Sequence, residues 1–269
     1  MQAQRLPASR GWLWIVEGFR LFRRNPSLLT FLVFSYWMVL VSVNLVPVIG
    51  WIAASLGMPA MSVGVMNGCR ALERGDPVPI TTVFSGFQRN ASTLITLGGM
   101  YLLATIGILT LTMLIDGGVL LKAMLSGKPA EPEALNDASM ALALQAALLL
   151  MVPVMMAFWF APLLAAWAGC GAGKSLFFSL VASFRNWRAF LVYAAGVAVL
   201  SAILPGILLG AVAVVSRTLL NIMVVALTLP LLFVFVPTLF ASFYVSYRDV
   251  FATAPTGRSA NGNADAPAS

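Results

Sequence analysis

Histidine is absent from this sequence of 269 residues, cysteine occurs only twice, and charged residues make up only 9% of it. Without histidine there is no His-ligated metal, no Ser-His-Asp triad and no imidazole proton shuttle. Cys69 and Cys170 fall near the expected cytoplasmic ends of helices, where thiols stay reduced, so we expect no disulfide. The nine acidic residues form no obvious cluster with a nucleophile. The sequence therefore predicts no enzyme, no catalytic residue, no metal and no cofactor.

Long apolar runs occupy most of the chain. Hydrophobic residues account for 60% of it and the mean hydropathy is +0.93, which is more apolar surface than a soluble domain can hide. A helix of about 20 apolar residues crosses the ~30 Å hydrocarbon layer, whereas barrel strands would alternate in polarity. We predict an all-α polytopic membrane protein with six transmembrane helices, at about Pro26–Leu45, Val48–Cys69, Ala91–Leu114, Ala138–Trp167, Trp187–Leu209 and Leu220–Ser246.

The basic residues predict the orientation of these spans. With the N-terminus in the cytoplasm, 13 of the 16 Lys and Arg residues lie inside, and Lys122, Lys128 and Arg217 lie outside. Because short loops rich in Lys and Arg stay inside, we expect both termini to be cytoplasmic. The net charge of +7 is divided among several loops, which favours anionic membrane lipids as partners and argues against nucleic acid.

A short motif, in which Phe is followed within three residues by Arg-Asn, occurs three times, as FRRNPSLL, FQRNASTL and FRNWRAFL. Each copy immediately precedes a span that starts on the cytoplasmic side. Asn is a favoured helix N-cap, Pro suits the next position, and Arg can bind a lipid phosphate through two hydrogen bonds. We interpret each motif as a helix cap and headgroup anchor. The alternative interpretation is a functional site for a lipid headgroup or a partner protein. The candidates are Arg23, Arg24, Asn25, Arg89, Asn90, Arg185 and Asn186.

An amphipathic stretch precedes each of these motifs. Apolar residues recur there with helical spacing, which is typical of helices that lie in the plane of the membrane interface. The three apolar faces are Trp12, Ile15, Phe19 and Phe22, then Ile80, Val83, Phe84 and Phe87, and finally Leu176, Phe177, Leu180, Val181 and Phe184.

The even-numbered spans share a second landmark. Each carries a proline near its middle and a basic residue 11 or 12 positions later, in the pairs Pro59 and Arg70, Pro162 and Lys174, and Pro237 and Arg248. Eleven helical residues rise ~16 Å, half of the hydrocarbon layer, so we expect the prolines to bend the helices near the bilayer midplane and the basic residues to lie near the lipid headgroups. The two landmarks together predict three tandem helical hairpins with cytoplasmic interfacial helices, related about an axis along the membrane normal.

Three regions follow from this pattern. Residues 1–25 form a cytoplasmic amphipathic segment, residues 26–251 the six-helix transmembrane domain, and residues 252–269 a cytoplasmic tail whose composition predicts disorder.

Three further patterns have competing interpretations. AGCGAGKS, at residues 168–175, resembles a phosphate-binding loop, but Ala168 replaces a required glycine and a membrane helix precedes it, so we prefer a Gly-rich turn and expect no nucleotide. Asp116 and Lys122 are candidates for transport or for simple contact with the membrane surface. The GxxxG pairs Gly64/Gly68 and Gly206/Gly210 permit close helix contact, within the bundle or in a homo-oligomer.

Three segments carry a family resemblance: RGWLWIVEGFRLFRRNP, MPAMSVGVMNGCRALERGDPV and FAPLLAAWAGCGAGKSLFFSLVASFRNWRAFLVY. Together they resemble a family of bacterial inner-membrane proteins of unknown function, over nearly the whole chain apart from the tail. The repeated hairpins are more distantly similar to the membrane domains attached to some glycerophosphodiester phosphodiesterases, whose hydrolase domain has no counterpart in this sequence. The resemblance implies six helices in the cytoplasmic membrane and supplies no binding or catalytic residue.

Two functions fit these expectations. The first is a non-enzymatic membrane protein that organises lipid or partner proteins at the cytoplasmic leaflet. The second is a small transporter or permease for an apolar or amphipathic solute, in which Pro59, Pro162 and Pro237 would free backbone carbonyls that line a cavity. A closed apolar interior favours the first, and a polar cavity centred on the prolines favours the second.

Overall fold

The computed structural model describes residues 3–46, 49–126 and 138–251, and every regular element in these ranges is helical. Six helical stretches in them are long and apolar enough to cross a membrane: Pro26–Asn44, Ile49–Arg74, Ala91–Asp116, Ala138–Ala168, Trp187–Val215 and Arg217–Phe251. The predicted all-α fold with six spans is confirmed. The tail at residues 252–269, for which we predicted disorder, lies outside the described residues.

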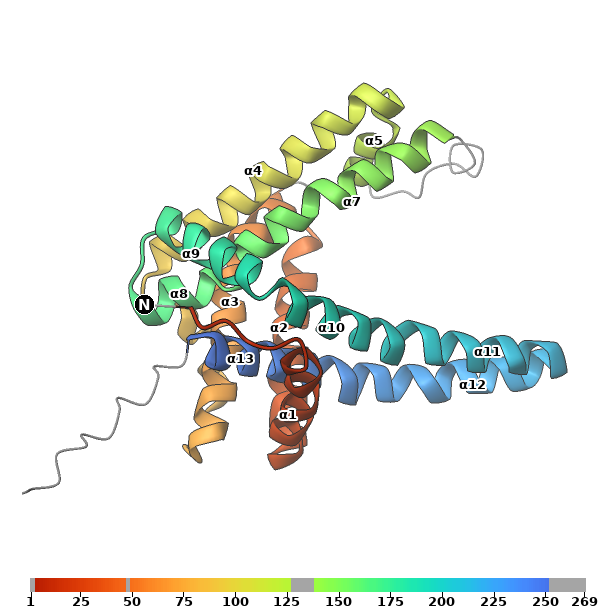
Figure 1. The fold of residues 1–269 in the computed structure, drawn as a ribbon, viewed down its shortest axis with the longest axis horizontal. Coiled ribbons are helices and arrows are strands. Elements are labelled where there is room, and N and C mark those ends of the chain that lie inside the picture. The colour runs from red at the N-terminus through yellow and green to blue at the C-terminus, as the bar shows by residue number, and fades with distance from the viewer. Residues whose placement is uncertain (1–2, 47–48, 127–137, 252–269) are drawn as a thin grey trace, which may run out of the picture.

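The spans pair in chain order into three hairpins (Figure 1). The first consists of α2 (Pro26–Asn44) and α3 (Ile49–Arg74). The second consists of α4 (Ala91–Asp116) and α7 (Ala138–Trp159), with α5 (Val119–Ser126) against its tip and α8 (Ala161–Ala168) after it. The third leaves through α10 (Trp187–Ala198), η2 (Val199–Ile203) and α11 (Leu204–Val215) and returns through α12 (Arg217–Pro230), η3 (Leu231–Phe235) and α13 (Val236–Phe251).

A shorter helical element precedes each hairpin and packs on the returning helix of a neighbouring one. The three are α1 (Arg10–Arg24), η1 (Ile80–Phe87) and α9 (Ala172–Arg185). Along the chain, η1 packs on α3 of the hairpin before it and α9 on α7 of the hairpin before it, while α1 packs on α13 of the last hairpin. This cyclic order is what three tandem repeats closed into a ring would show, so it agrees with the predicted threefold repeat.

Glycine residues allow α1 to approach two helices of the third hairpin closely. A Cβ atom on Gly11 would lie 2.0 Å from the Ala189 carbonyl oxygen in α10, and one on Gly18 would lie 2.6 Å from the Ser242 backbone nitrogen in α13. Both distances are far below van der Waals contact, so no larger residue fits without displacing α1. Trp14, between these glycines, is fully buried.

We predicted that Trp12, Ile15, Phe19 and Phe22 form one apolar face of α1 at the membrane interface, but two of them pack against the protein. The helix buries Gly11, Trp14, Ile15, Gly18, Leu21 and Phe22 against the protein, while Trp12 and Phe19 remain exposed. The prediction missed this because it counted only apolar side chains, whereas the closest contacts of α1 are made by glycine.

The other two elements keep an exposed apolar face, as interfacial helices do. In α9, Phe177 and Phe184 are exposed whereas Ser175, Ser179 and Ser183 are buried. The element η1 is a 3₁₀ helix, in which residues three apart lie on one side. Val83 is therefore buried while Phe84 and Phe87 are exposed, and the α-helical face that we predicted at residues 80–87 is corrected to this arrangement.

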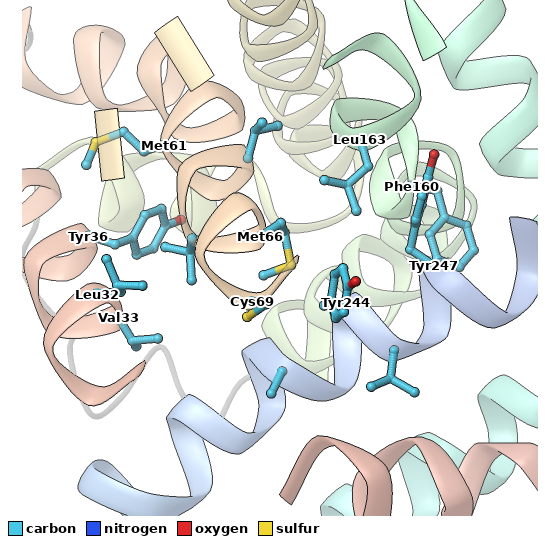
Figure 2. Close-up of a cluster of buried hydrophobic side chains, with 14 of the residues drawn as sticks. Leu32, Val33, Tyr36, Met61, Met66, Cys69, Phe160, Leu163, Tyr244 and Tyr247 are labelled. Atoms are coloured by element: carbon cyan, nitrogen blue, oxygen red, sulfur yellow. The ribbon is translucent and has the colours of Figure 1, made fainter. Parts of the chain in front are cut away.

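The main core lies where α2, α3, α8 and α13 meet (Figure 2). It contains Leu32, Val33, Tyr36, Met61, Met66, Cys69, Phe160, Leu163, Tyr244 and Tyr247. Gly68 of α3 meets the Leu32 side chain, and Gly64 of the same helix meets the backbone of η1, so the first GxxxG pair packs within the chain.

The third hairpin extends from this core as an arm (Figure 1). None of the residues in η2, α11, α12 or η3 is buried, although the arm is strongly apolar. A surface of this kind needs lipid around it. A Cβ atom added at Gly206 or Gly210 would meet no atom of another described segment within 4 Å, so this GxxxG pair makes no close helix contact there, and contact between copies stays a prediction.

Substitution of Gly18 by alanine tests the docking of α1. The added Cβ would collide with the backbone at Ser242, so we expect Gly18→Ala to lower the free energy of unfolding by about 1–3 kcal/mol. Gly206→Ala is the matched control, because its Cβ meets open space and favours the helix. Thermal unfolding in detergent, followed by circular dichroism, measures both, and equal stability of the two variants would refute the docked position.

Candidate functional site

An apolar groove of about 620 Å³ lies between α1 and the third hairpin. Trp12, Ile15, Val16 and Phe19 form the α1 wall, at the spacing of one helix face. The facing wall comprises Leu200, Leu204, Pro205, Leu208, Leu227, Pro230, Leu231, Val234, Phe235 and Thr238. The Thr238 hydroxyl is already bonded to the Val234 carbonyl at 2.7 Å. The groove has the volume of a small-ligand pocket, and its lining suits an apolar group.

Two π-helical turns shape the facing wall. η2 and η3 each end two residues before a proline, Pro205 and Pro237. Proline has no N–H, so the carbonyl four residues earlier loses its α-helical partner. At Phe233 that carbonyl accepts a hydrogen bond from the Thr30 hydroxyl of α2, at 3.1 Å. Single π turns are frequent at functional sites, and here both contribute side chains to the same groove.

A cluster of charged side chains fixes α1 to the end of α13. Asp249 accepts hydrogen bonds from Arg10 Nε at 2.8 Å and from Trp14 Nε1 at 3.0 Å. Glu17 pairs with Arg248 at 2.6 Å and with Arg10 at 3.2 Å. Isolated surface ion pairs contribute little to stability, but connected ones restrict geometry more strongly. The cluster therefore sets the position of α1 beside the groove.

Glu73 extends this cluster to α3. It accepts a hydrogen bond from Tyr244 at 2.5 Å and pairs with Arg248, and its backbone carbonyl accepts one from Arg24 at 3.0 Å. The sequence placed Arg248 among the lipid headgroups and Arg24 at a lipid phosphate. In the structure Arg248 pairs with the carboxylates of Glu17, Glu73 and Asp249, and Arg24 has a protein partner. Spacing along one helix could not reveal ion pairs between distant segments.

The three asparagines of the repeated motif have different roles. Asn25 accepts a hydrogen bond from the Leu28 N–H at 3.1 Å, and Pro26 follows it at the first helical position, as in a capped helix. The capping prediction is wrong for Asn90 and Asn186, whose side chains make no cap hydrogen bond.

Both asparagines bond to distant backbone instead. Asn90 has a left-handed backbone (φ 54°), which is not the extended conformation of a cap, and it donates to the Ala165 carbonyl at 2.9 Å. Asn186 accepts from the Leu6 N–H at 2.8 Å and donates to the Gln4 carbonyl at 2.9 Å. It thereby holds the N-terminal segment that leads into α1.

The remaining arginines of the motif, Arg23, Arg89 and Arg185, are all exposed. None of them forms an ion pair within the described residues, where Arg10 and Arg248 supply the basic side chains of every salt bridge. These three remain available to an anion from outside the chain. Arg70, another predicted headgroup cation, lies instead over the Trp167 ring, 5.0 Å from its centre.

The predicted proline bends differ from one another. Pro59 is buried inside a continuous α3, and Gly98 of α4 approaches the Ser55 carbonyl that Pro59 leaves without a helical partner. Pro162 is in the first turn of α8, after a break in the span at Phe160, so its position near mid-span is corrected to the end of the fourth span. Pro237 follows η3 near the middle of the sixth. None of these three prolines lines the groove.

Serine residues of α9, which the sequence analysis missed, satisfy the backbone at the Phe160 break. Ser179 Oγ accepts from the Phe160 N–H and donates to the Met156 carbonyl, both at 2.9 Å, and Ser183 donates to the same carbonyl at 3.1 Å. Their spacing of four, together with Ser175, marks a polar helix face and was the available signal. Asp116 has a similar structural role, because its carboxylate accepts from the Gly118 and Leu120 N–H groups at the start of α5.

Comparison with known proteins shows the family to which the chain belongs. The probable inner membrane protein BTH_II0599 of Burkholderia thailandensis is 35% identical to the chain over 263 residues, which cover 96% of each sequence. The chain belongs to this family of inner membrane proteins. No protein-family model matches it, and no solved structure does. With its six apolar helices, the chain is an integral protein of the inner membrane, as the resemblance implied.

Removal of the Ser179 hydroxyl tests the repair of the break at Phe160. In Ser179→Ala the buried Phe160 N–H has no partner, so we expect a loss of about 1–3 kcal/mol in the free energy of unfolding. Ser201→Ala is the control, because Ser201 bonds only to the Val197 carbonyl of its own helix and should change stability by less than about 0.5 kcal/mol. Chemical unfolding in mixed micelles compares them, and a Ser179→Ala protein as stable as the control would contradict this role.

Proposed function

We propose that this inner membrane protein organises anionic lipid at the cytoplasmic leaflet without catalysing a reaction. The observation that carries the proposal is the groove between α1 and the third hairpin, which is lined by apolar side chains and opens beside a surface rich in arginine. A site for a polar substrate would need several convergent polar groups. An acyl chain needs only apolar contact.

The interfacial elements give the same indication. Exposed phenylalanines lie close in sequence to exposed arginines in two of the motifs, Phe87 with Arg89 and Phe184 with Arg185. Aromatic rings that enter the acyl boundary and guanidinium groups that bind phosphate are the two requirements of an interfacial lipid anchor. The proposal places this end of the molecule, with both termini, in the cytoplasm, because 13 of the 16 basic residues then lie inside.

A transporter is the second candidate, and the prolines bear on it. The carbonyl that Pro237 leaves unpaired meets Thr30 of a neighbouring span, and the one that Pro59 leaves unpaired lies against Gly98. Since these carbonyls meet other helices, they give little support to a polar path along the prolines. The distant similarity to the membrane domains of glycerophosphodiester phosphodiesterases stays a prediction.

Neutralising the exposed arginines tests lipid organisation. We expect Arg89→Gln/Arg185→Gln to lower the ratio of phosphatidylglycerol to phosphatidylethanolamine that co-purifies with the protein at least twofold, and more strongly at low salt, because screening weakens exposed charges. The control is Lys122→Gln/Arg217→Gln, which removes the same charge from the opposite end. Lipid mass spectrometry after mild detergent extraction measures the ratio. An unchanged ratio in the first variant, or an equal fall in the control, would refute the proposal.

A further inference from the structure

We infer that the groove between α1 and the third hairpin binds one anionic phospholipid, with an acyl chain in the groove and the headgroup phosphate at Arg20 and Arg23. This inference rests on the proposed function and adds to it a defined site, a stoichiometry and a headgroup preference. Four observations carry it: the lining of the groove, its openness to the bilayer, the position of the two arginines and the lack of acidic partners for them.

The groove is accessible from the hydrocarbon layer. Leu204 and Leu208 on one wall and Trp12 and Phe19 on the other are each 41–53% exposed although they line it. The neighbouring surface of the third hairpin is equally apolar, with Ile207 67% exposed. An acyl chain can therefore enter sideways from the bilayer and meet only apolar surface on its path.

Of the two arginines, Arg23 continues the face of α1 that lines the groove, and Arg20 flanks that face. Arg20 comes four residues after Val16, and Arg23 four residues after Phe19, so each lies one turn beyond a lining residue. Both precede the start of the first span at Pro26. The groove is thus apolar along its length and cationic beyond one end, which is the distribution of polarity that a phospholipid presents.

Neither arginine has an acid to neutralise it. Arg10 and Arg248 engage Glu17, Glu73 and Asp249, whereas Arg20 and Arg23 are exposed and form no salt bridge within the described residues. Two adjacent guanidinium groups without a counterion attract a phosphate and can each bind it with paired hydrogen bonds.

The same charges set the headgroup preference. Phosphatidylglycerol carries a phosphate without a cation, whereas the ammonium group of phosphatidylethanolamine would lie close to Arg20, Arg23 and the adjacent Arg24 and be repelled. We therefore expect phosphatidylglycerol to bind at least tenfold more tightly than phosphatidylethanolamine with the same acyl chains.

Native mass spectrometry of the full chain, delipidated and titrated with palmitoyl-oleoyl phosphatidylglycerol, tests the site. We expect one high-affinity lipid per wild-type chain. Leu204→Trp, which fills the groove, and Arg20→Gln/Arg23→Gln, which removes its charge, should each raise the dissociation constant of that lipid at least tenfold. Two controls should keep it within twofold: Ile207→Trp, which adds the same ring outside the groove, and Lys122→Gln/Arg217→Gln, which removes the same charge from residues that take no part in the proposed lipid contacts.

The outcomes separate this inference from the proposed function. If the wild type retains phosphatidylglycerol but Leu204→Trp and Arg20→Gln/Arg23→Gln both bind it as tightly as the wild type, the groove site is wrong while lipid organisation stands. If the wild type shows no preference for phosphatidylglycerol in this titration or on co-purification, both are wrong. Circular dichroism of each variant shows whether it is folded, and the charge variant, which alters only exposed side chains, tests the site even if Leu204→Trp does not fold.

Discussion

The docking of α1 on the third hairpin is the contact on which the other features of this structure depend. Through Gly11 and Gly18 the helix reaches the backbone of α10 and α13, and through Arg10 and Glu17 it pairs with the end of α13. The first segment of the chain is thereby joined to the last span, which closes the cyclic order of the three hairpins. The same helix supplies one wall of the groove, so the groove exists only while α1 is docked.

Lipid as a solvent explains why two irregular parts of the spans, at Phe160 and before Pro237, are paired with polar side chains from elsewhere in the chain. An unsatisfied backbone group in hydrocarbon costs several kcal/mol. The break at Phe160 is satisfied by Ser179, and the carbonyl freed by Pro237 by Thr30. These hydroxyls come from other hairpins or from the elements between them, so the repair of each helix also fixes how the hairpins pack.

Much of the fold could be predicted from the sequence because it follows from solvent and period. Continuous apolar runs predicted six spans, and five of the six begin within one residue of the predicted starts, at Pro26, Ile49, Ala91, Ala138 and Trp187. The sixth begins at Arg217, three residues before the predicted Leu220, because Ser216 caps the helix there. The exposed face of α9 also followed from its period, because only local spacing decides it.

The site could not be predicted to the same extent because contacts between distant segments define it. Arg248 and Glu17 are 231 positions apart, and no local pattern indicates that they meet. Asn90 and Asn186 resemble Asn25 in sequence, yet their side chains bond to Ala165 and to the N-terminal segment. The spacing of seven that relates Gly11 to Gly18, and Trp14 to Leu21, was the one available signal that α1 packs on protein.

Disulfide formation between α1 and α10 in native membranes tests the central claim, the docked position of α1, most directly. A Cβ on Gly196 would lie 2.8 Å from the end of the Ile15 side chain, so cysteines at these two positions, with Cys69 and Cys170 replaced by alanine, are close enough to pair. We expect a rapid cross-link on mild oxidation for Ile15→Cys/Gly196→Cys and none for Ile15→Cys/Gly210→Cys. Failure of the first pair to cross-link, or equal cross-linking of both pairs, would contradict the docked position.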